Sequence, residues 1–238
     1  YDVTGTRSTQ VRGGTGIFTG RLPFVWIGNT TANQGDGSIF TSINATDPDF
    51  KWPQVWNTNV AIDHELPGGF LGTLELLYGK DINAIVIRNA NLGTPIRNLP
   101  DGRPFYGGAK ADPNGPGVYV LDNTNEGSHI NVTAQLRKSF ASGLSTSLSY
   151  SFLEAKNQIT STEIAQFFWE GNPVQGDPNN PTLSFSEFGN RHRIVGGGSY
   201  SKRWSNSLAT HFGLFVEVAQ GAVSTAGAKS RFSYTYAG

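Results

Sequence analysis

The residue types that most often carry catalysis or bind metals are sparse in this sequence and form no known motif. The chain has no cysteine, and its four histidines are His64, His129, His192 and His211. No two of them have the His-Glu-x-x-His spacing that sets two imidazoles and a general base on one helix face. No Gly-x-Ser-x-Gly segment occurs, and no nucleophile can be paired with a base. The sequence therefore predicts no enzymatic activity, no catalytic residue, no metal site and no cofactor.

Two short segments resemble ligand-binding loops, but neither completes its motif. Residues 122–127 begin like a calcium loop with glycine at the sixth position, yet Thr133 stands where a bidentate glutamate is needed. Residues 13–16 are glycine-rich like a phosphate loop, but no Gly-Lys-Ser or Gly-Lys-Thr follows them. We interpret the first segment as a polar turn and expect no nucleotide site at the second.

The best candidate for a contact surface is the polar, proline-rich stretch 156–187. As an external loop it could bind substrate or a partner lipoprotein, because exposed loops often carry such functions. The alternative, which we favour, is a self-packed loop whose aromatic side chains bury one another. The candidate contacts are Phe167, Phe168, Trp169 and Asp177.

Composition points to an all-β protein and away from several function classes. Lys plus Arg and Asp plus Glu number 18 each, so the basic stripe of a nucleic-acid binder is not expected. Gly- and Asn-rich breaks separate aromatic and β-branched runs, as in proteins built from strands that short turns connect. No run approaches the ~18 apolar residues of a membrane helix. A transmembrane barrel strand is only half apolar and escapes that criterion.

Alternation of polar and apolar residues marks the predicted strands, because successive side chains of a strand point to opposite faces. It is clearest in 144–152, where serines alternate with larger apolar residues. The other predicted strands are 55–66, 70–87, 128–140, 191–202, 208–218, 230–236 and a short one at 23–27, with 10–18 as a loop. Six apolar residues of these strands are predicted to face lipid: Leu74, Leu76, Leu148, Tyr150, Phe212 and Leu214.

Short turns alternate with long connections along the chain. The predicted turns are 67–69, 141–143 and 205–206, and the long connections are 89–116 and 156–187, the latter with a helix expected at 162–169. Outer-membrane barrels have short periplasmic turns and long extracellular loops. Trp204, beside a predicted turn, suits an interfacial aromatic belt. We therefore predict an antiparallel meander that forms part of a large transmembrane β-barrel with long extracellular loops.

Segments spread over nearly the whole chain resemble the barrel of Oar-like TonB-dependent transporters of Bacteroidota. They are Gln10–Trp26, Phe50–Asn59, Tyr78–Asn83, Leu121–Gly127, Ala134–Phe140, Phe188–Ile194 and Phe232–Gly238. The resemblance implies active uptake of a nutrient such as a peptide, glycan or chelate across the bacterial outer membrane. It also implies a TonB energy-transducing complex that acts through a plug, and contact with the lipid bilayer. The external loop adds a surface lipoprotein as a candidate partner.

The resemblance also implies that residues 1–238 are a partial barrel. Large outer-membrane transporters have about 22 strands around a plugged lumen, whereas this sequence offers seven to nine candidate strands and no recognisable plug or TonB box. It contains no methionine either, which favours a processed chain or a fragment. The alternatives are a passive porin or small structural barrel, a soluble β-rich carbohydrate-binding module and, last, an enzyme.

Overall fold

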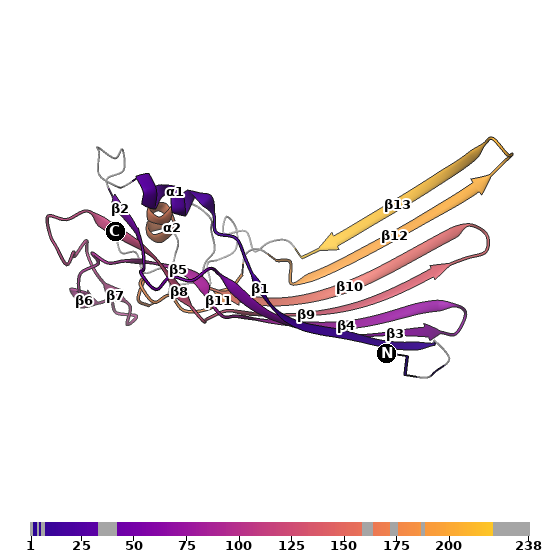
Figure 1. Cartoon of the computed structure of the whole chain (residues 1–238), viewed down its shortest axis with the longest axis horizontal. Helices are drawn as coiled ribbons and strands as arrows, with labels where there is room; N and C mark the ends of the chain where they lie inside the picture. Colours follow the sequence, from indigo (N-terminus) through magenta and orange to yellow (C-terminus); the bar gives the residue numbers. More distant parts are fainter. Residues whose placement is uncertain are drawn as a thin grey trace.

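A computed structural model describes residues 2–3, 5, 8–32, 42–158, 164–171, 176–186 and 189–220, and most of them lie in antiparallel strands. One long sheet dominates (Figure 1), with the strand order β1-β3-β4-β9-β10-β12-β13. Its strands are β1 (Thr9–Thr19), β3 (Gln54–Leu66), β4 (Phe70–Asp81), β9 (Ser128–Ser139), β10 (Leu144–Asn157), β12 (His192–Arg203) and β13 (Ala209–Ala219), and the short β11 (Ser184–Phe185) pairs with β10. Neither described helix is long and apolar enough to cross a membrane.

The strands of the long sheet are unusually long. They contain 11 to 14 residues each, whereas strands of globular proteins usually have about 5–6. A tilted strand of about 9–11 residues crosses the hydrocarbon core of a membrane. Each long strand is therefore sufficient to span it.

Three hairpin turns lie together at one end of the sheet, which we call the turn end (right in Figure 1). They join β3 to β4, β9 to β10 and β12 to β13, at the predicted turn positions. Gly143 shows why one turn needs glycine: its φ is +85°, and a Cβ there would lie 2.5 Å from the Ser201 carbonyl oxygen. All long connections consequently leave the sheet from the opposite end, the loop end.

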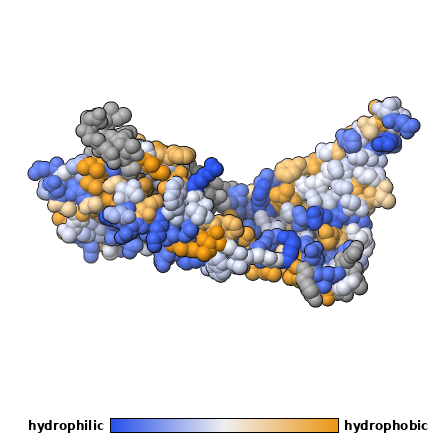
Figure 2. Space-filling model, in the orientation of Figure 1, coloured by the Kyte–Doolittle hydropathy of each residue, from blue (hydrophilic) through white to orange (hydrophobic). Residues whose placement is uncertain are grey.

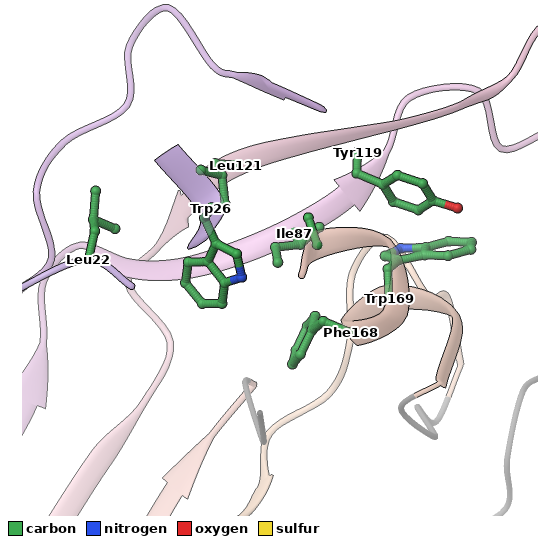
Figure 3. Packing of buried hydrophobic residues seen from close by; sticks show 8 residues of the cluster. Leu22, Trp26, Ile87, Tyr119, Leu121, Phe168 and Trp169 are labelled. Atoms are coloured by element: carbon green, nitrogen blue, oxygen red, sulfur yellow. The ribbon is translucent and has the colours of Figure 1, made fainter. Parts of the chain in front are cut away.

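The loop end carries a small globular unit, the loop module (left in Figure 1). It consists of a three-stranded sheet in the order β2-β8-β5, two helices and a short hairpin. Their bounds are β2 (Ser42–Thr46), β8 (Gly117–Thr124), β5 (Ala84–Asn89), α1 (Phe24–Ala32), α2 (Ala165–Gly171), β6 (Arg97–Asn98) and β7 (Pro104–Phe105). Figure 3 shows its core, where Trp26, Ile87, Tyr119 and Trp169 converge from four different elements.

The long sheet has almost no buried core of its own. Among the described residues, Ala61 is the one hydrophobic residue of its strands that is buried, and the other buried hydrophobic residues belong to the loop module and its connections. Figure 2 shows hydrophobic side chains exposed over the strands as well as over the loop module. A sheet of this size must bury at least one face to be stable, so its stability has to come from surroundings outside these residues.

Four local predictions were wrong, and each has a structural reason. Residues 10–18 are strand β1 rather than a loop, because β1 pairs with β3 along its whole length although Gly13, Gly14 and Gly16 interrupt its pattern. Residues 24–32 form helix α1 rather than a strand at 23–27, because Trp26 fills the module core.

The other two corrections concern the loop module. The predicted strand 70–87 is divided into β4 and β5, which belong to different sheets, because the carbonyl oxygen of Gln54 accepts hydrogen bonds from the N–H groups of Ile82 (2.9 Å) and Asn83 (3.4 Å). Residues 122–124, predicted as part of a polar turn, are the end of strand β8, and residues 125–127 connect it to β9. The predicted strand 230–236 lies outside the described residues.

Candidate functional site

The register of the long sheet sorts its side chains onto two faces of opposite character. Directly paired residues share a face, and one row across the sheet is apolar. That row is Val11, Ile62, Leu74, Ala134, Tyr150, Ile194 and Val218. We call the face that contains it the apolar face and the other the polar face.

All six residues predicted to face lipid lie on the apolar face. Their side chains are exposed, from 40 % for Leu76 to 71 % for Leu214. The structure thus brings them onto one surface, as alternation required. Their contact with lipid stays a prediction.

Aromatic residues border the apolar face at both ends. At the loop end Trp56 and Tyr78 meet edge to face, with ring centroids 6.1 Å apart. At the turn end lie Phe70 and Trp204. Phe70 and Tyr78 are on one strand, about 26 Å apart at roughly 3.3 Å per residue. If the strand tilts by about 40° from the membrane normal, the two residues are about 20 Å apart along that normal, close to the ~25 Å height of the apolar band of outer-membrane barrels.

Charged side chains on the polar face neutralise one another. On the β1–β4 side, Arg12 contacts Asp63 at 3.0 Å and Glu75 at 3.4 Å. The Thr73 hydroxyl also donates to Asp63, at 2.5 Å. On the far side, Arg193 pairs with Glu217 at 2.7 Å. Both signs of charge therefore line this face, which suits an aqueous interior better than a hydrocarbon one.

Small residues line the polar face over strands β10, β12 and β13. Ser145, Ser147, Ser149 and Ser151 lie on this face of β10, and Gly197 and Gly213 lie on the same face of β12 and β13. Such small groups leave free space above the sheet. At the loop end of the same face, Gly79 is buried beneath His129 and Asn57, both of which a Cβ at this position would overlap.

The four histidines are distributed over both faces and do not form a site. His64 and His192 lie on the apolar face, and His129 and His211 lie on the polar face. His64 hydrogen-bonds Thr9 at 2.8 Å, and the other apolar-face histidine contacts Tyr150 at 2.8 Å. Within the described ranges no group of three or more His, Cys, Asp or Glu residues could hold a metal ion.

The predicted external contacts divide between the interior and the surface of the loop module. Phe168 and Trp169 are each 7 % exposed and pack in its core, where the Trp169 ring lies 5.8 Å from that of Tyr119 (Figure 3). Phe167, by contrast, is 58 % exposed. The aromatic cluster is therefore not a single surface patch, and only its first member is exposed.

Hydrogen bonds hold the segment that contains Asp177 against strand β5. Its carboxylate accepts hydrogen bonds from the N–H of Asn179 at 2.9 Å and from the hydroxyl of Tyr106 at 3.4 Å. The Asn179 amide in turn accepts from the N–H of Asn89 at 2.7 Å and donates to its carbonyl at 2.9 Å. These contacts give Asp177 a positioning role within the loop module.

Electrostatic contacts hold other parts of the module that the sequence did not single out. Arg88 bridges Asp47 and Asp122, at 3.0 Å to each carboxylate. The N–H of Asp49 and then Arg88 hold the pKa of Asp47 below its usual value. Burial, and then its hydrogen bond to Glu170, raises the pKa of Tyr119.

One exposed aromatic residue of the loop module was also missed. Phe24, on helix α1, is 83 % exposed. No signal in the sequence distinguished it, because the neighbouring residues suggested a strand. With Phe167 it gives the module two exposed aromatic side chains on its helices.

Comparison with known proteins agrees with this geometry. A family model described as an outer membrane beta barrel domain matches residues 1–210. No curated protein matches the chain.

Proposed function

The chain belongs to the family of outer membrane β-barrel domains of the bacterial outer membrane, and from that membership we propose that its long sheet is part of the wall of a TonB-dependent transporter. The transporter takes up a nutrient such as a peptide, glycan or chelate. The observation that carries the proposal is the separation of the long sheet into an exposed apolar face and a charged, serine-lined polar face.

The open edges of the sheet support a wall that is larger than these strands. Among the described strands, β1 pairs only with β3 and β13 pairs only with β12, although an isolated bridge joins Asp2 to Gln10 at the outer edge of β1. Unpaired backbone groups in lipid cost several kcal/mol each, so spanning sheets must close into barrels. In the proposal, further strands complete that closure.

The side chains of the polar face support a wide lumen. A barrel of about 8 strands has an interior that side chains fill. The serines of β10 and the glycines beside them are too small to fill such an interior. In the proposal a plug occupies the lumen, and the TonB complex supplies energy through that plug.

The loop module supports an orientation for the wall. Short turns face the periplasm and long loops face outward in outer-membrane barrels. The loop module, with Phe24 and Phe167 exposed, would thus meet substrate or a surface lipoprotein outside the cell. The chain performs no catalytic step in this proposal.

Dependence of uptake on TonB tests the proposal and separates it from a passive porin. A strain that lacks the full-length gene should lose growth on at least one peptide, glycan or chelated-metal source in a nutrient panel. Inactivating TonB in the wild-type strain should cause the same loss. Growth that requires the gene but survives TonB inactivation would replace the transporter with a porin.

A further inference from the structure

A shallow apolar hollow lies on the apolar face toward the turn end. Its volume is about 450 Å³, and its lining is almost wholly apolar. Leu66, Leu74, Leu136 and Leu148 form its walls.

Two small residues create this hollow. Gly72 and Ala134 line it on the adjacent strands β4 and β9, and Leu74 and Leu136 neighbour both of them on the same face. A Cβ at Gly72 would lie only 3.1 Å from the Leu66 side chain. Larger side chains at these two positions would therefore fill the hollow.

A lysine stands at the turn-end border of the hollow. Lys138 follows Leu136 by two residues on β9 and so lies on the same face. Its ammonium group lies 4.5 Å from the ring centroid of Phe70 and 4.4 Å from that of Phe140. Within the part of the chain that the structure describes, Lys138 forms no salt bridge. Its charge is thus held at the membrane border by two aromatic rings and remains open to an anion.

The order of these features matches the order of groups in a phospholipid. With the turn end in the periplasm, a phosphate group at the membrane surface would meet Lys138 first. The acyl chain would then run toward the membrane centre through the hollow, which lies between Lys138 and that centre. Among the apolar-face residues at the turn end of β3, β4 and β9, none is acidic, so none would repel the phosphate.

We propose that the apolar face binds one glycerophospholipid of the periplasmic leaflet, with its phosphate at Lys138 and an acyl chain between Leu66 and Leu148. The site rests on the proposed orientation of the wall and not on the transported nutrient. It would anchor the wall at a fixed depth at this position.

Native mass spectrometry of the full-length protein in mild detergent, titrated with dioleoylphosphatidylglycerol, tests the site. Lys138→Gln should weaken binding of the first lipid about fivefold, the factor that corresponds to ~1 kcal/mol per basic residue at an anionic surface. Lys138→Arg should retain it. Ala134→Leu, which fills the hollow, should also weaken binding.

Two matched variants control for general effects of charge and bulk. Lys202 lies at the same border on β12, over the Trp204 ring at 4.0 Å, but not at the hollow. Gly198 faces the same way, and a Cβ there meets only the Ser145 carbonyl oxygen, at 3.7 Å. Lys202→Gln and Gly198→Leu should therefore leave binding of the first lipid unchanged.

Three results would overturn the site. The first is an equal loss in the Lys138→Gln and Lys202→Gln proteins, which would indicate a general effect of rim charge. The second is equal affinity for dihexanoyl- and dioleoylphosphatidylglycerol, or displacement by inorganic phosphate, which would leave the hollow without a role. The third is surface labelling of Ser142 in intact cells, which would place Lys138 in the outer leaflet. Nutrient uptake is measured separately, so failure of transport would leave the lipid result standing.

Discussion

Placing a charge at the middle of the apolar face is the most direct test of which face meets lipid. Leu74 lies midway between Phe70 and Tyr78 on β4, about 10 Å from either aromatic border when the strand tilts by about 40°. Arginine at a lipid-facing midplane position costs about 2–4 kcal/mol. We therefore expect Leu74→Arg to lower the free energy of unfolding of the full-length protein by that amount.

Depth provides an internal gradient for the same experiment. Leu76 lies on the same strand, two residues from Tyr78 where Leu74 is four residues away, so Leu76 is half as far from the loop-end border. Because the cost falls to about 0–1 kcal/mol near the interface, Leu76→Arg should cost about half as much as Leu74→Arg. The measurement is denaturant unfolding from phospholipid vesicles, followed by tryptophan fluorescence and by gel mobility of unheated samples.

The control places arginine on the polar face, in the row of paired residues next to that of Leu74. Ser149 pairs with Gln135 and Val195, so an added arginine meets no charge directly across the strands. Ser149→Arg should change the unfolding free energy by less than about 1 kcal/mol, because it points toward water. If Leu74→Arg and Ser149→Arg unfold at the same denaturant concentration with equal slopes, the assignment of the faces is wrong.

Three further predictions concern orientation, packing and pH. In intact cells an epitope tag beside Asp177 should bind antibody and a tag at Ser142 should not, and the reverse pattern would invert the topology. Gly79→Ala should lower the free energy of unfolding by about 1–3 kcal/mol, because its Cβ overlaps His129; unchanged stability would show that the ring moves aside freely. The pKa of Tyr119 is raised by burial, so the loop module should be stable below about pH 10 and lose stability as the pH rises further. That loss should be smaller in Tyr119→Phe, in which Tyr106 remains as a second buried tyrosine with a raised pKa, as measured by near-ultraviolet circular dichroism.

The hairpins of the long sheet could be predicted because the sequence pattern that specifies each of them lies within one short stretch of the chain. In 144–152 the alternation of serine with larger residues fixed both the strand and its faces, and the glycine at 143 marked the turn before it. Strand β1 was missed because three glycines interrupt its pattern. Only its pairing with β3, along the whole strand, identifies it.

The loop module could not be predicted because its information is not local. Strand β2 pairs in parallel with β8, which lies more than 70 residues further along the chain. The core brings Trp26, Ile87, Tyr119 and Trp169 together from four elements, and none of these elements is long enough to show a clear period. The burial of Trp169 and the exposure of Phe167 follow from that assembly, so the surface contacts could not be told from the core by sequence.

The two parts of the structure therefore obtain their stability from different sources. The loop module buries aromatic and aliphatic side chains against one another, as a small water-soluble domain does. The long sheet exposes its large apolar residues and buries almost none, so removing it from lipid would leave that face in contact with water. Changes in the module core should thus affect how Phe24 and Phe167 are presented outside the cell without removing the wall from the membrane. Changes on the apolar face should affect the stability of the wall and leave the module core intact.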